Sequence, residues 1–227
     1  VGAKFTTGMK LEVEAKALFG RTPDFRYWYA DAGVTLPQGI PIFPGFEINY
    51  FGGGMFNRMK MAGTTDQKDV QYAQIGASSS GVIYEPFNEN GFGMKASVGI
   101  ITAGSPDLFN ATVEFGMSFL RSGGLQEIYM KGEGELISKL PKEFYDLLDN
   151  KLKDIAYDKI PDDQTILSDY NPKGAISANV FIKLDFVNDI SHATSEVYIN
   201  LFGILEGVGA NGRAGWLDFY VGPDKWH

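Results

Sequence analysis

The feature that most constrains the fold is a strict alternation of apolar and polar residues over runs of about ten residues. In "FNATVEFGMSF" (109–119) every odd-numbered residue is apolar, whereas Asn110, Thr112, Glu114 and Ser118 are polar. Successive side chains of a β-strand point to opposite faces, so such a run predicts a strand with one apolar face. The same pattern recurs in three other runs: "KLEVEAKALF" (10–19), "AISANVFIKLDF" (175–186) and "EVYINLFGIL" (196–205).

Turn-forming residues separate these runs. Gly123-Gly124, the Ser-Pro-Asp of "AGSPDL" (103–108) and Asn188-Asp189 each predict a tight reversal of the chain. Consecutive hairpins imply antiparallel neighbours. We therefore expect an all-β fold, built as a large antiparallel sheet or sandwich of long hairpin-connected strands.

One segment departs from the alternation. Residues 141–160 carry apolar side chains at helical spacing between Pro141 and Pro161, which predicts one amphipathic helix. We expect a single β-rich domain over 1–227, with two possible sheet halves, 1–138 and 174–227, separated by the helix region.

Composition narrows the function classes. The 28 glycines, 17 phenylalanines and 11 tyrosines suit strands and turns, and a net charge of −8 disfavours binding to nucleic acid. The chain has no cysteine, which excludes disulfides and thiolate chemistry, and no apolar run long enough for a transmembrane helix. We expect no cofactor and no metal.

Alternation alone does not say which face is covered. The small residues Ala15, Ala17 and Ala178 favour an apolar face packed against another layer, with the polar face in solvent. The alternatives are an outer-membrane-type β-barrel, whose apolar face contacts lipid and whose polar face lines the lumen, and a sheet that binds a hydrophobic ligand. Periodicity cannot separate these architectures.

Candidate site residues are few. "GVGANG" (207–212) has the glycine spacing of a dinucleotide-binding loop, but no helical pattern follows it, so we expect a turn. Trp28 beside Arg26, together with Trp216, are candidate ligand-binding residues of a carbohydrate-binding module that uses exposed aromatics. Glu133 and Glu135 share one phase of a run and would be the pair for a carboxylate-based hydrolase, although solvation alone explains them. We assign no catalytic residue and expect a protein that is not an enzyme.

Three stretches add a resemblance: "GVTLPQGIPIFPGFEINYFGGGMFNRM" (33–59), residues 91–137 and "GRAGWLDFYVGPDKWH" (212–227). They resemble segments of very large, β-rich surface or secreted proteins of Bacteroidetes-type bacteria. The resemblance implies a segment of a longer exported chain, located outside the cell or at its surface in association with the outer membrane. It also implies a structural or adhesive interaction module without catalysis. Its partners would be other segments of the same or a neighbouring surface protein, or a glycan.

Overall fold

A computed structural model describes residues 1–8, 10–61, 84–137, 175–201 and 205–223. The described residues form a large antiparallel sheet of eleven strands and a separate two-stranded ribbon. The fold class predicted from the sequence is thus confirmed as all-β. The strands of the large sheet are β1 (Gly2–Thr6), β2 (Glu12–Arg21), β3 (Arg26–Phe43), β4 (Phe46–Asn57), β7 (Asn90–Thr102), β8 (Phe109–Leu120), β9 (Leu125–Leu136), β10 (Ile176–Asp185), β11 (Ile190–Leu201), β12 (Leu205–Glu206) and β13 (Arg213–Val221).

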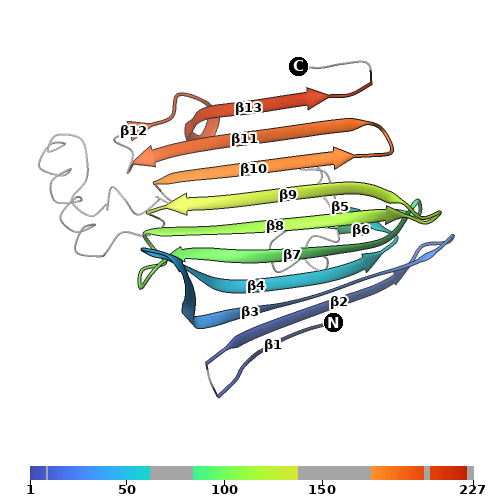
Figure 1. The fold of residues 1–227 in the computed structure, drawn as a ribbon, viewed down its shortest axis with the longest axis horizontal. Coiled ribbons are helices and arrows are strands. Elements are labelled where there is room, and N and C mark those ends of the chain that lie inside the picture. Colours follow the sequence, from blue (N-terminus) through green and yellow to red (C-terminus); the bar gives the residue numbers. More distant parts are fainter. Residues whose placement is uncertain (9, 62–83, 138–174, 202–204, 224–227) are drawn as a thin grey trace, which may run out of the picture.

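The strands follow one another in sequence order from β1 to β11, except that β4 lies beside β7. Both β12 and β13 pair with β11, and β13 forms the far edge of the sheet (Figure 1). The segment between β4 and β7 contributes the ribbon, made of β5 (Met59–Met61) and β6 (Tyr84–Pro86). The topology is therefore a meander with one excursion.

The predicted turns are present. Gly123 and Gly124 have φ angles of 90° and 91° between β8 and β9, a region that favours glycine. The "GVGANG" stretch contains a short 3₁₀ turn, Ala210–Gly212, and leads directly into β13. The expectation of a turn there is confirmed.

The sheet is continuous across the middle of the sequence. β9 pairs with β10 over ten residue pairs, from Leu136 opposite Ile176 to Glu127 opposite Asp185. The two possible sheet halves therefore share one hydrogen-bonded sheet. The helix predicted at 141–160 lies outside the described residues. Within the described ranges, no helix has the length and apolar character needed to cross a bilayer.

Burial across the sheet is the reverse of our first expectation. On β8, Phe115 is 42% exposed whereas its neighbour Glu114 is 1% exposed. On β7, Met94 is exposed and Lys95 is buried. The register of the strands puts the alternating apolar residues on one side, which we call the apolar face, and the alternating polar residues on the other, the polar face. Among the described residues, the ribbon β5–β6 packs on part of the polar face, whereas many large side chains of the apolar face are exposed. Packing of the apolar face against a further layer stays a prediction.

Aromatic rings and glycines explain how the polar face packs. A Cβ atom built on Gly116 would overlap the ring of Tyr129 on the adjacent strand, and one on Gly93 would overlap the ring of Phe56. Each ring thus lies flat across the neighbouring strand, where only a glycine leaves room for it. This packing explains why glycines and tyrosines occupy positions of the polar face.

A small core lies between this surface and the ribbon. Its buried members come from β3, β4, β5 and β6, and partly buried apolar side chains border it: Tyr27, Tyr29, Phe56, Met59 and Tyr84, with Leu18, Phe25 and Met61 around them. Tyr84 packs against both Tyr29 and Phe56, with ring centroids 5.2 Å and 4.6 Å apart. The ribbon is therefore fastened to the polar face by aromatic contacts.

Candidate functional site

The most unusual group on the polar face is a buried ion cluster around Lys95. Lys95 Nζ lies 3.3 Å from Asp31 Oδ2 and 3.2 Å from Glu114 Oε2, and all three side chains are at most 2% exposed. The residues come from β7, β3 and β8, and Gly54 on β4 lies between Asp31 and Lys95 in the register. Because Gly54 has no side chain, the ammonium group can reach across β4 to Asp31.

Two phenols complete the cluster. Tyr129 donates to Glu114 Oε1 at 2.6 Å, and Tyr84 on the ribbon donates to the same oxygen at 3.4 Å and is hydrogen-bonded to Tyr129. Burial is the largest cause that raises the pKa of Tyr84 well above its usual value of 10. Electrostatic interactions with Tyr129 and Glu114 raise it further. Tyr84 therefore stays a neutral donor at physiological pH.

The geometry of the cluster favours a role in stabilising the fold over a role in binding a solute. Buried charges are stabilised only when they are paired and hydrogen-bonded, and here one ammonium serves two carboxylates while phenols satisfy Glu114. The Lys95 ammonium also lies 5.5 Å and 5.8 Å from the ring centroids of Tyr29 and Tyr84. These contacts join strands β3, β7, β8 and β9 to the ribbon.

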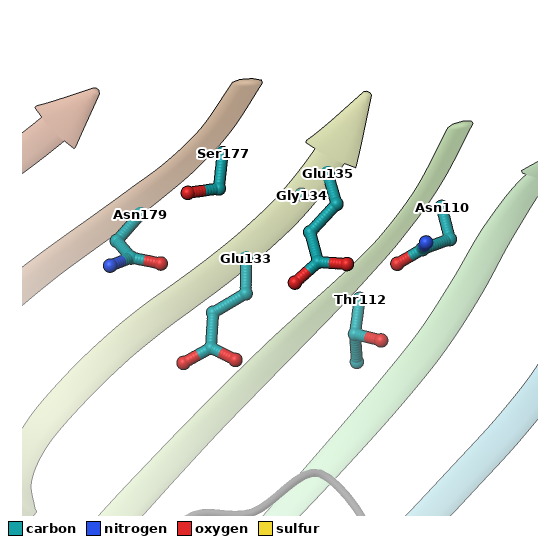
Figure 2. A pocket seen from close by; sticks show the side chains of 7 residues that line it. All are labelled: Asn110, Thr112, Glu133, Gly134, Glu135, Ser177 and Asn179. Atoms are coloured by element: carbon teal, nitrogen blue, oxygen red, sulfur yellow. The ribbon is translucent and has the colours of Figure 1, made fainter. Parts of the chain in front are cut away.

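A second feature of the polar face is an open hollow near the ends of β8, β9 and β10 (Figure 2). Its volume is about 230 Å³. Carboxylate, amide and hydroxyl side chains line it: Asn110, Thr112, Glu133, Glu135, Ser177 and Asn179, with the backbone of Gly134. Glu133 is paired with Lys131 at 2.7 Å. The hollow presents oxygen-rich groups suited to water and polar solutes.

The structure separates the ligand-binding residues proposed from the sequence. Trp28 and exposed Arg26 lie on β3 with side chains in the apolar phase, whereas Tyr27 and Tyr29 lie buried on the polar face. Trp216 lies on β13 in the polar phase, opposite Glu196, and is 68% exposed. The candidate residues thus occupy opposite faces and distant strands of the sheet. Glu133 and Glu135 share the hollow, as their common phase predicted.

Arg26 belongs to a basic rim. A hollow of about 520 Å³ at the start of β3 is lined by residues of the β2–β3 turn and the end of β4, three of them arginines: Arg21, Pro23, Asp24, Phe25, Arg26, Asn57 and Arg58. The rim lies at the same end of the strands as Trp28. Arg21, Arg26 and Trp28 share the apolar phase and therefore lie at one end of the apolar face.

The ion cluster was missed by the sequence analysis, which treated charged residues of the polar phase as solvated. One signal was available: Gly93, Lys95, Ser97 and Gly99 occupy successive polar-phase positions of one strand. The small residues on either side of the lysine leave room for larger side chains of adjacent strands to pack over it. Identifying those groups requires the pairing of β7 with β4 and β8.

Comparisons with protein-family models, with curated proteins and with solved structures found no match. Among the described residues, no three His, Asp or Glu side chains gather in a way that could hold a metal ion.

Proposed function

We propose that this sheet is part of the wall of an outer-membrane-type β-barrel. Its apolar face contacts lipid, and its polar face lines an aqueous interior that the ribbon partly fills. The observation that carries the proposal is the reversed burial: large apolar side chains are exposed over the whole sheet while lysine and carboxylates are buried. The exposed members are spread from the first strand to the last and include Phe5, Phe19, Met55, Met94, Phe115, Leu136, Leu184, Leu217 and Phe219. In water such a surface is costly, since each buried apolar side chain of this size contributes roughly 1.5–3 kcal/mol.

Strand length supports the proposal. β4, β8, β9 and β11 each have 12 residues, and β7 has 13. A tilted strand needs about 9–11 residues to cross the hydrocarbon region of a bilayer. Hairpins of this length, with alternating lipid-facing and interior-facing residues, are typical of outer-membrane walls.

The ends of the apolar face support it as well. Trp28 and Phe19 are paired near one end, beside the arginine rim. At the other end Phe46 packs against Phe43 and Phe109, with ring centroids 4.8 Å and 5.5 Å apart. Outer-membrane barrels carry girdles of aromatic residues at both interfaces of the membrane, and arginines there can meet anionic headgroups.

Spin labels on neighbouring residues test the proposal, because the chain contains no cysteine. Asn179 and Val180 are adjacent, half-buried residues in the middle of β10, on the polar and the apolar face respectively. In phosphatidylcholine vesicles, we expect a label at Val180→Cys to be relaxed by lipid-soluble oxygen. A label at Asn179→Cys should be relaxed by a water-soluble nickel chelate, and the ratio of the two accessibilities should invert between the sites.

Equal accessibility of both labels to the nickel chelate would contradict the membrane wall. It would favour the other expectation from the sequence, an adhesive module at the cell surface whose apolar face packs on a further protein layer. Location at the cell surface is common to both proposals.

A further inference from the structure

The two edge strands of the sheet carry the further inference, which rests on the proposed membrane wall. In the described part of the chain, β1 pairs with β2 alone and β13 with β11 alone. The two strands form opposite edges of the sheet (Figure 1). Their outer backbone N–H and C=O groups would cost several kcal/mol each if left unpaired in hydrocarbon. A wall in lipid therefore needs a strand at each edge.

The directions of the edges are compatible with each other. Each pairing on the path from β1 to β13 is antiparallel, and the alternation makes β1 and β13 run in opposite directions. β1 can therefore continue the meander if it is placed beside β13 of another copy. The apolar faces of the two copies then lie on the same side.

In β1, the backbone N–H and C=O groups that point to the outer edge belong to the even-numbered residues. Val1 and Ala17 exchange both backbone hydrogen bonds, at 2.7 Å each, so the odd-numbered residues of β1 bond to β2. Gly2, Lys4 and Thr6 consequently direct their N–H and C=O groups to the free edge. Their side chains lie on the polar face, as the pairing of Lys4 with Glu14 requires.

The same reasoning applies to β13. Asn200 donates its backbone N–H to Ala175, so the even-numbered residues of β11 bond toward β10 and the odd-numbered ones toward β13. Ala193 and its partner Phe219 therefore form a hydrogen-bonded pair. Trp216, Asp218 and Tyr220 are left with backbone groups that point to the free edge.

We infer that β1 of one copy pairs with β13 of a second copy, with Lys4 opposite Asp218. Both side chains are exposed, at 64% and 45%, and carry opposite charges. Within one copy Lys4 pairs with Glu12 at 3.2 Å and Asp218 contacts His192 at 2.8 Å, so the contact between copies extends these exposed pairs across the edge. This register also puts Gly2 opposite Tyr220, which repeats the arrangement of a ring beside a glycine seen for Tyr129 and Gly116. A shift by one residue would exchange the two faces.

The apolar phase fits the same register. Phe5 meets Leu217 and Ala3 meets Phe219, so the exposed apolar side chains of the two edges form one surface. A shift by two residues would place Lys4 against Trp216 or Tyr220 and remove the charge pair. Because the contact joins two different edges, it can repeat from copy to copy, and it forms a closed wall when the rotation between copies completes a ring.

Disulfide cross-linking in vesicles tests this pairing in the cysteine-free chain. Two single variants, Lys4→Cys and Asp218→Cys, are mixed before reconstitution into phosphatidylcholine vesicles and then oxidised. We expect a cross-linked dimer on a non-reducing gel, because Cα atoms of directly opposite residues are within disulfide range. The matched control mixes Lys4→Cys with Trp216→Cys, two residues out of register, and should give a yield lower by at least about tenfold.

Three results would overturn the inference. Equal yields from both mixtures would show that the register is wrong. No dimer from the mixture, with a cross-link inside single copies of the double variant Lys4→Cys/Asp218→Cys, would show that one copy closes on itself. No cross-link in either experiment would show that the edges do not meet. The labels at Asn179 and Val180, measured in the same vesicles, distinguish these results from failure of the membrane wall itself.

Discussion

The two regions of the polar face are packed differently. Between β3 and β9 the ribbon covers part of the face, and there the ion cluster lies, in which Lys95, Asp31 and Glu114 are almost inaccessible. From β10 to β13 the face carries ion pairs that solvent reaches, such as Arg213 with Glu196 at 3.2 Å. The same alternation thus supports a self-packed region and an open region. Alternation in the sequence therefore does not determine whether a residue of the polar face is buried, because burial depends on which part of the chain packs over that residue.

The largest expected effect comes from the buried ammonium group. Lys95→Met leaves two buried carboxylates beside each other and should lower the free energy of unfolding by about 3–5 kcal/mol. Arg213→Met breaks an exposed pair and should change it by at most about 1 kcal/mol. Urea unfolding in detergent micelles, followed by tryptophan fluorescence, measures both. Equal effects would show that the two regions do not differ in their electrostatics.

The second prediction concerns the addition of a methyl group at a glycine in each region. Gly116→Ala places a Cβ inside the ring of Tyr129 and should cost about 1–3 kcal/mol. Gly215→Ala on β13 meets no heavy atom within 4 Å, so it should be neutral or stabilise by up to about 1 kcal/mol. The same unfolding measurement compares them. A neutral Gly116→Ala variant would mean that the ring does not lie over the glycine.

The smallest expected effect concerns single hydroxyl groups. Tyr84→Phe removes the donor that links the ribbon to Glu114 and should cost about 1–2 kcal/mol. Tyr198→Phe removes a more accessible hydrogen bond to Glu196, which is 2.8 Å long, and should cost less than about 1 kcal/mol. Protease cleavage within the β5–β6 segment offers a second measurement. It should accelerate in Tyr84→Phe and stay unchanged in Tyr198→Phe.

Much of the fold could be predicted from the sequence because strand alternation and turn chemistry are local. The runs at 109–119 and 175–186 predicted which residues share a face, and Gly123-Gly124 predicted a hairpin. Which face is covered could not be predicted in this way, since alternation is the same for both solutions. The ion cluster depends on the position of Lys95 near Asp31, which is 64 residues away, and on the register that places Gly54 between them.

The glycine–aromatic pairs also restrict how this protein can change by single replacements. A larger residue at Gly116 meets the ring of Tyr129, whereas a smaller residue at Tyr129 leaves a cavity and removes the hydrogen bond to the buried Glu114. Either replacement alone damages the packing, so the two positions should change together. Homologous chains should accordingly show paired replacements at these two positions, with tyrosine beside glycine and small aliphatic residues beside alanine.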